Sequence, residues 1–197
     1  MFRIRNLYFA YPNQPALFKD LQAEFYLKQN TLIQGENGCG KSSLLKLLVG
    51  DLKAQSGSIS LTPDKAWFYV PQDAQSRILG LTIEQDLRLW QIAGLQLSLD
   101  QLANLPLLRG FDPELFQLPL RELSTGTKQA YVLSLALLHS NSYLILDEAL
   151  PGLDEQRRII FSSELSRHKG ILAVSHDAFS EPDIFDHTLI LQNGGLF

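Results

Sequence analysis

Apolar and polar positions follow patterns along this chain that predict several strands. Residues 2–9 alternate between apolar and polar side chains, which is typical of a strand with one buried face, and residues 17–27 form a second region of this kind. Continuous apolar runs, which are typical of parallel strands buried on both faces, occupy residues 31–33, 143–146 and 171–174. Further strands are expected at residues 57–61, 66–70 and 188–191. We expect Gly194 and Gly195 to close the last of these strands.

Leucine-rich segments between the strands have helical spacing instead. The helices are expected at residues 42–49, 84–108, 125–140 and 155–167. Gly50 ends the first of them, and Gly94 and Pro106 interrupt the second. Strands that alternate with helices predict an α/β protein. We therefore expect a single domain, residues 1–197, with an N-terminal antiparallel β region and a helical subdomain, about residues 80–135, inserted into its core.

Composition narrows the functional classes. Of the 197 residues, 45% are hydrophobic and 19% are charged, so the chain can bury an ordinary globular core. A net charge of −4 and the lack of a basic run argue against a nucleic-acid partner. Cys39 is the only cysteine, which excludes an internal disulfide and fits a reducing compartment. Residues 1–6 lack the apolar core of a signal peptide, and no apolar run is long enough to cross a bilayer, so work at a membrane would need a membrane partner.

A glycine-rich loop joins the apolar run at residues 31–33 to the first helix. It reads Gly35-Glu36-Asn37-Gly38-Cys39-Gly40-Lys41-Ser42 and matches GxxxxGK[ST] at every fixed position. Glycines allow a tight turn whose N–H groups point at phosphates, and the following helix adds its positive N-terminal end. Lys41 would reach the β- and γ-phosphates, and the Ser42 hydroxyl would bind Mg²⁺. Strand, loop and helix in this order favour a P-loop NTPase core over a chance glycine-rich turn.

Two acids, Asp147 and Glu148, directly follow the apolar run at residues 143–146. Ligands of open α/β sheets bind at this end of the strands. Asp147 would hold Mg²⁺ through water, and Glu148 would act as general base on the attacking water. Alone, the pair would equally fit a solvated acidic turn. Together with the phosphate loop, it predicts phosphoryl transfer.

Further segments resemble the ATP-binding subunits of ABC transporters. Residues 123–127, Leu-Ser-Thr-Gly-Thr, resemble the signature usually written LSGGQ in its place and spacing. Tyr8 to Tyr11 resemble the segment whose aromatic side chain stacks on adenine, and Pro71-Gln72 resembles the Q-loop. Pro151 to Asp154 resemble the D-loop, and Ser175-His176-Asp177 resembles the segment with the switch histidine. These elements follow the family order and span essentially the whole chain.

This resemblance implies a role for each matching residue around ATP. Tyr11 would stack on the adenine ring, and residues 35–43, with Ser43 as the last, would cradle the triphosphate. Gln72 would sense Mg²⁺ and the attacking water. His176 would contact the γ-phosphate.

The resemblance also implies partners. Two ATP-binding subunits of this family sandwich two ATP molecules, so Ser124 and Gly126 would reach the ATP of a second copy, and Asp154 would touch that copy. A helix start in the inserted subdomain lies too far from its own chain's ATP, which makes a dimer a sensible geometry. The second copy would be identical or related. A transmembrane subunit would carry out transport, with this chain on the cytoplasmic face. The leucine-rich residues 83–108 are typical of subdomain core more than of a binding helix, and an exposed part of their apolar face would be a docking surface for that subunit.

Departures from the family pattern leave other interpretations open. Thr125 and Thr127 replace the usual glycine and glutamine of the signature, and Ala130 and Ala149 replace a common arginine and proline. A β-branched residue would hinder close approach to phosphate, which favours an ATP-binding module without hydrolysis. Glu148 and His176 are both present and favour hydrolysis instead. A soluble ABC ATPase that acts on ribosomes or DNA is less favoured, because such proteins usually carry paired domains, long coiled coils or basic arms, and none is seen here. A P-loop kinase is less favoured still, because it does not need residues 123–127 and His176 together.

Two transporter types share features with the chain. Residues 75–86 resemble the ATPases of energy-coupling-factor importers, which take up vitamins, cobalt or nickel. The short chain and residues 33–35 resemble the ATPase of haem export in cytochrome c maturation. We favour a micronutrient importer.

Overall fold

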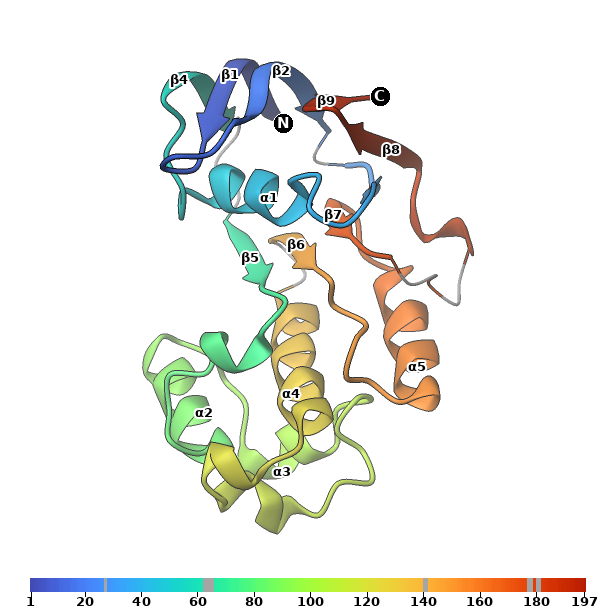
Figure 1. The fold of residues 1–197 in the computed structure, drawn as a ribbon. Helices are drawn as coiled ribbons and strands as arrows, with labels where there is room; N and C mark the ends of the chain where they lie inside the picture. Colours follow the sequence, from blue (N-terminus) through green and yellow to red (C-terminus); the bar gives the residue numbers. More distant parts are fainter. Residues whose placement is uncertain (27, 62–65, 140–141, 177–178, 180–181) are drawn as a thin grey trace.

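The computed structural model places two β-sheets at one end of the molecule and a group of helices at the other (Figure 1). It describes residues 1–26, 28–61, 66–139, 142–176, 179 and 182–197. None of the described helices is long and apolar enough to cross a membrane.

The smaller sheet is antiparallel. It contains β1 (Phe2–Ala10), β2 (Ala16–Phe25) and β4 (Ser56–Leu61) in the order β2-β1-β4. Buried positions on β1 change from even numbers, at Phe2 and Ile4, to odd numbers, at Leu7 and Phe9. A register shift between Ile4 and Leu7 explains the change, because one extra residue turns the following side chains to the other face.

The larger sheet has six strands in the order β5-β6-β7-β3-β8-β9. Its parallel strands are β3 (Thr31–Gln34), β5 (Trp67–Val70), β6 (Tyr143–Asp147), β7 (Ile171–Val174) and β8 (His187–Gln192). The sixth strand, β9 (Gly195–Leu196), pairs antiparallel with β8. The expectation that Gly195 closes the last strand is therefore wrong, since Gly195 pairs with Gln192 and only Gly194 remains in the turn.

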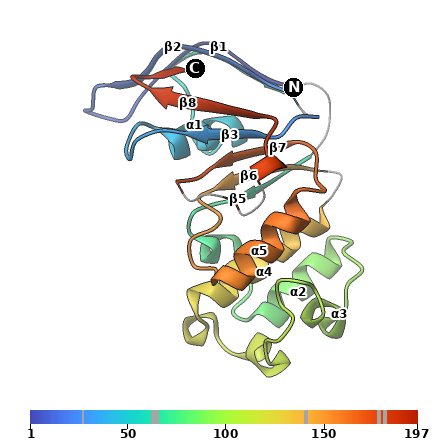
Figure 2. The same cartoon turned by 90° about the vertical axis from the view of Figure 1, so that its right-hand side faces the viewer.

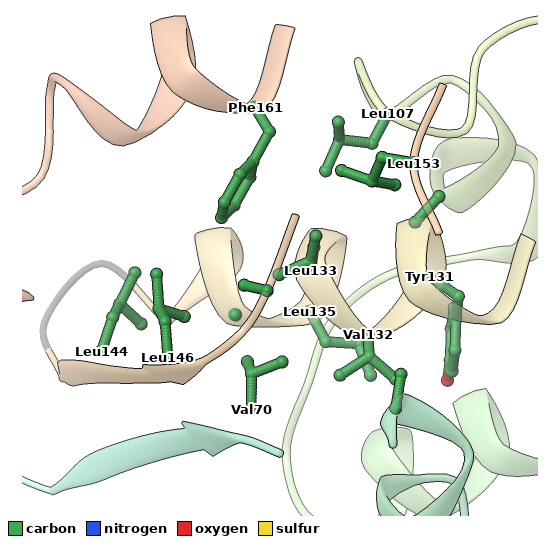
Figure 3. Packing of buried hydrophobic residues seen from close by; sticks show 14 of the residues in the cluster. Val70, Leu107, Tyr131, Val132, Leu133, Leu135, Leu144, Leu146, Leu153 and Phe161 are labelled. Carbon is green, nitrogen blue, oxygen red and sulfur yellow. The ribbon is translucent and has the colours of Figure 1, made fainter. Parts of the chain in front are cut away.

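Both faces of the larger sheet are covered. Helix α1 (Lys41–Val49) packs between the two sheets, where its leucines share a core with Phe18 and Ile145. Helices α4 (Thr125–Leu138) and α5 (Glu155–Leu165) cover the opposite face (Figure 2). Figure 3 shows Leu133 and Leu135 of α4 among Leu144 and Leu146 of β6. Burial on both faces explains why β6 is apolar at successive positions.

The segment between β5 and β6 contains further helices, which lie at the end of the molecule away from the sheets (Figure 1). They are α2 (Ile83–Ile92), α3 (Leu99–Ala103) and the short 3₁₀ turns Ala74–Arg77, Pro113–Gln117 and Leu120–Glu122, while a fourth 3₁₀ turn, Pro182–Ile184, precedes β8. The expected helix at residues 84–108 is thus two short helices, with a break that begins at Ala93, the C-cap of α2, and includes Gly94. Helices α4 and α5 end slightly earlier than expected, at Leu138 and Leu165.

Candidate active site

The phosphate loop wraps around the ammonium group of its own lysine. Lys41 is buried, and its Nζ donates hydrogen bonds to the carbonyl oxygens of Gly35 at 2.9 Å and Glu36 at 3.0 Å. Gly40 caps α1 with a φ of 109°, a left-handed conformation that a side chain would strain. The loop therefore brings its cation and the N-terminal end of a nine-residue helix to one place.

Asp147, the last residue of β6, is hydrogen-bonded to the start of α1. The Ser42 hydroxyl donates to Asp147 Oδ1 at 2.7 Å, and the Tyr69 hydroxyl donates to Oδ2 at 3.2 Å. Burial and the nearby Asp147 carboxylate raise the pKa of Tyr69, so the phenol remains a donor. Among the described residues no cluster of three or more His, Cys, Asp or Glu side chains exists that would hold a metal unaided. The hydroxyl and carboxylate oxygens nevertheless suit Mg²⁺, which binds few protein ligands and prefers to complete its shell with water and phosphate.

Tyr69 was not identified from the sequence. It lies on β5 and pairs with Ile145 of β6, so its contact with Asp147 depends on the neighbouring strand. No local pattern around residue 69 signals that contact.

Glu148 has an unusual backbone and a fixed side chain. Its φ is 50°, a left-handed conformation that costs a residue with a Cβ roughly 1–2 kcal/mol. Its N–H donates to the carbonyl oxygen of Val174 at 2.9 Å, which joins the ends of β6 and β7. The buried carboxylate accepts the backbone N–H of His176 at 3.2 Å, and its other oxygen lies 3.2 Å from His176 Nε2. The structure therefore holds the two residues together, while Asp177 lies outside the described residues.

A cavity of about 630 Å³ collects most of the expected site residues. It is lined by Tyr11, Gln14, Leu17, Asn37, Gly38, Gly40, Lys41, Ser42, Ser43, Gln72, Glu148, Pro151 and His176. The Tyr11 hydroxyl lies 2.9 Å from Ser43 Oγ, and its ring meets Phe9 edge to face at 5.0 Å between centroids. Segments from five separate parts of the chain thus meet in one hollow.

Gly35, Glu36 and Cys39 face a different hollow. Together with Lys19 and the turn between β8 and β9, they line a larger space of about 820 Å³. This space includes neither Lys41 nor any of the buried acids, so its size does not make it the better candidate. A Cβ at Gly35 would collide with the carbonyl oxygen of Leu191, which shows that glycine at position 35 allows β8 to pass close behind the loop.

The signature-like residues lie apart from the cavity, at the helical end of the molecule where α4 begins (Figure 1). Ser124 caps α4, because its hydroxyl accepts the N–H of Thr127 at 3.0 Å. Thr127 is buried, and its own hydroxyl lies 2.8 Å from Ser124 Oγ. Thr125 is exposed beside them. The structure thus gives Thr127 a local role as a partner of the capping serine.

A second segment packs against this helix start. A Cβ at Gly126 would lie only 2.6 Å from the carbonyl oxygen of Gly152, so the two backbones touch. Gln129, which is buried, donates its Nε2 hydrogen to the carbonyl oxygen of Ala149 at 2.8 Å. Asp154 caps α5 by accepting the N–H of Arg157 at 2.8 Å, and that hydrogen bond lowers the pKa of its carboxyl group. The residues that follow Glu148 are therefore bound to α4.

A parallel sheet, a lysine-bearing phosphate loop after β3 and two acids at the end of β6 define a P-loop ATPase. A family model described as ABC transporter matches residues 18–151. The energy-coupling factor transporter ATP-binding protein EcfA1 of Thermotoga maritima is 34% identical, over 92% of this chain and 75% of that protein. The cytochrome c biogenesis ATP-binding export protein CcmA of Bartonella quintana is 29% identical, over 93% of this chain and 91% of that protein. A solved ATP-binding subunit of an ABC transporter superposes with a TM-score of 0.80 at 25% identity, over all of this chain and 88% of that one.

This chain belongs to the ABC transporter family, in which it is an ATP-binding and ATP-hydrolysing subunit.

Proposed function

We propose that this chain binds ATP with Mg²⁺ in the 630 Å³ cavity, hydrolyses it with Glu148 as general base, and thereby drives a separate membrane subunit. One observation carries the proposal. Lys41, Ser42 and the Glu148–His176 pair line a single hollow together with the aromatic ring of Tyr11, and Ser42 is hydrogen-bonded to Asp147 behind it.

ATP and Mg²⁺ would bind to groups that are hydrogen-bonded to one another in this structure. Lys41 would exchange its hydrogen bonds with two loop carbonyls for the stronger, charge-assisted bonds to the β- and γ-phosphates. Ser42 and Asp147 would hold Mg²⁺, which when bound neutralises phosphate charge. The Tyr11 ring would stack on adenine, and Ser43 would lie beside the phosphates.

Hydrolysis would depend on Glu148. Its carboxylate would orient the attacking water and take its proton. Gln72 and His176 line the same cavity, and there they would contact the attacking water and the γ-phosphate. The backbone bond from His176 to Glu148 keeps the base in place despite its left-handed backbone. Because His176 also faces that carboxylate through Nε2, the positions of the two groups are linked.

A second ATP-binding subunit would complete each site. Ser124 and Gly126 lie outside their own chain's cavity, at an exposed helix start that attracts anions. We propose that they contact the ATP held by the second subunit, and that the segment around Asp154 contacts that subunit directly. The packing of Gly126 on Gly152 makes these two surfaces one continuous face.

A membrane subunit would dock on the helical end, at the cytoplasmic face of the membrane where ATP is available. Leu79 and Leu81 follow shortly after Gln72 and are 80% and 76% exposed. Leu89 and Ile92 of α2 add further exposed apolar surface. Large apolar side chains in such positions suit the burial of a partner's helix.

The first test separates catalysis from binding. Glu148→Gln should lower ATP turnover at least 100-fold, since general bases contribute about 10²–10⁴-fold, while ATP affinity stays within a few fold. The exposed acid Glu114 provides a control, and Glu114→Gln should leave turnover unchanged. Turnover that survives in Glu148→Gln would remove Glu148 from its proposed role.

The second test identifies the partner. The Glu148→Gln chain, incubated with ATP and solubilised membranes of its host, should capture a membrane protein with several spans, detected by mass spectrometry. Adding Leu79→Glu should abolish the capture, whereas Ile159→Glu, at an exposed apolar position on α5, should not. Capture of only soluble proteins, such as ribosomal proteins, would contradict the transport role and leave the ATPase assignment in place.

A further inference from the structure

Asp86 is a buried carboxylate that the nucleotide site does not use. It is 1% exposed and accepts four hydrogen bonds. The donors are Leu79 N at 2.6 Å and Gly80 N at 3.1 Å to Oδ1, and Tyr131 Oη at 2.7 Å and Trp90 Nε1 at 3.0 Å to Oδ2. Burial and the bond to Asp86 raise the pKa of Tyr131, so the tyrosine remains a donor. A buried charge is costly unless every oxygen is matched, and here both oxygens are.

The two oxygens face different parts of the molecule. Oδ1 accepts the consecutive backbone N–H groups of Leu79 and Gly80, in the segment whose leucines are exposed. Oδ2 holds Tyr131, a fully buried side chain of α4 about two helical turns after Ser124 (Figure 3). One side chain therefore bridges the exposed segment and the helix that begins at the signature.

Two more bonds join residues next to these two parts. The N–H of Leu120, shortly before the signature, donates to the carbonyl oxygen of Leu81 at 3.0 Å. Lys128 of α4 donates to Gln75 Oε1 at 2.8 Å. The packing is also close, because a Cβ at Gly80 would collide with the backbone N of Asp86 and lie 2.8 Å from the carbonyl oxygen of Thr82. These contacts leave the segment little freedom to shift relative to α4.

We propose that Asp86 is a positioning residue that couples the Leu79–Leu81 segment to the start of α4, so that a load on the exposed leucines displaces Ser124 and Gly126 and the reverse also holds. Such coupling is reciprocal, because any state that favours one arrangement of α4 must favour the matching arrangement of the segment. The inference rests on the proposed docking of a membrane subunit at Leu79 and Leu81.

Hydrogen exchange on the purified, full-length chain provides the test, since it needs neither a partner nor ATP. Tyr131→Phe removes only the bond between Asp86 and α4, and Asp86→Asn keeps the shape of the side chain but mismatches one donor pair. Both should speed exchange of the Thr127 and Lys128 amides at least fivefold, while amides of α1 stay within twofold. The Thr127 N–H donates to the capping hydroxyl of Ser124, and the Lys128 N–H donates to the Ser124 carbonyl oxygen, so both amides report on the start of α4.

Trp90→Phe is the matched control. It also removes a donor from Asp86, yet Trp90 belongs to α2 and not to α4, so exchange at Thr127 and Lys128 should be unchanged. The two tryptophans of the chain add a local readout, since the indole N–H resonance of Trp90 should move in Asp86→Asn while that of the exposed Trp67 stays in place.

Two outcomes would overturn the coupling role and leave Asp86 as a structural residue. One is unchanged exchange at Thr127 in Tyr131→Phe and Asp86→Asn. The other is an equal rise of that exchange in Trp90→Phe. The result is independent of the membrane capture described above. A failed capture would refute the docking partner without altering the exchange rates, and unchanged exchange with a successful capture would refute only the coupling.

Discussion

Single residues in this chain have physical roles that their motifs alone do not reveal. Gly126 matches a signature glycine, which suggests close approach to a phosphate. The structure shows an additional reason, because any side chain there would collide with the carbonyl oxygen of Gly152. Glycine at this position is required within one chain, before any second subunit is considered.

Gln129 illustrates the same point and leads to a prediction. Its amide satisfies the buried carbonyl of Ala149, the residue after the proposed base. Gln129→Leu removes that donor and should lower the free energy of unfolding by about 1–3 kcal/mol. Because the peptide after Glu148 loses its anchor, kcat should also fall about tenfold, with KM for ATP within twofold.

Steady-state kinetics and chemical denaturation would check this prediction. Gln117→Leu, at an exposed position, is the control and should alter neither quantity. A variant that loses stability but keeps its kcat would show that Gln129 supports the fold without positioning the site.

At the scale of elements, one buried amide joins three strands of the larger sheet. Asn30 is fully buried just before β3. Its Oδ1 accepts the N–H groups of Gly170 and Ile171 at 2.9 and 3.2 Å, at the start of β7. Its Nδ2 donates to the carbonyls of His168 at 3.0 Å and Ile184 at 2.8 Å, the latter shortly before β8. Asn30 thus aligns the strands on both sides of β3.

Removing this side chain should cost more than an average substitution. Asn30→Ala leaves buried donors and acceptors unmatched, and we expect the free energy of unfolding to fall by about 3 kcal/mol or more. Urea denaturation would measure the change. Asn104→Ala removes only one exposed side-chain bond, to Asp100, and should cost well under 1 kcal/mol. Equal losses in the two variants would contradict the proposed alignment.

At the scale of the whole molecule, the separation of the cavity from the signature-like residues determines how the protein would work. A site that is complete only across two subunits requires association. With ATP and Mg²⁺, the Glu148→Gln chain should therefore sediment at twice its 22.2 kDa mass. Ser124→Arg should prevent this association because it places a bulky side chain at the start of α4, while ATP binding is retained.

Analytical ultracentrifugation would measure this association, and a fluorescent ATP analogue would measure binding. Ser60→Arg, at an exposed position on β4, is the control and should still associate. A Glu148→Gln chain that binds ATP and remains a monomer would show that the second subunit is a related chain and not an identical one.

Much of the fold and several site residues could be predicted because their signals are local. Lys41 and Ser42 follow from one glycine-rich loop between an apolar strand and a helix, and the structure places both in the cavity. The sheet and helix positions follow from burial patterns, with errors at the ends of elements, at Gly195 and at residues 84–108, where one expected helix is two short ones. Tyr69 had no such signal. Its hydroxyl contacts Asp147 across two neighbouring strands of the sheet, β5 and β6, which are far apart in the chain.

The sequence by itself determined most of the segments that become strands, the glycine-rich loop that leads into α1 and the two acids at the end of β6. These properties depend on neighbouring residues and on the spacing of apolar side chains. Only the tertiary structure decided that His176 holds Glu148, that Gln129 anchors the peptide after it, and that Asp86 bridges Leu79 and Tyr131. Each of these contacts joins elements whose approach depends on strand order and helix packing, and no local spacing in a single chain records that approach.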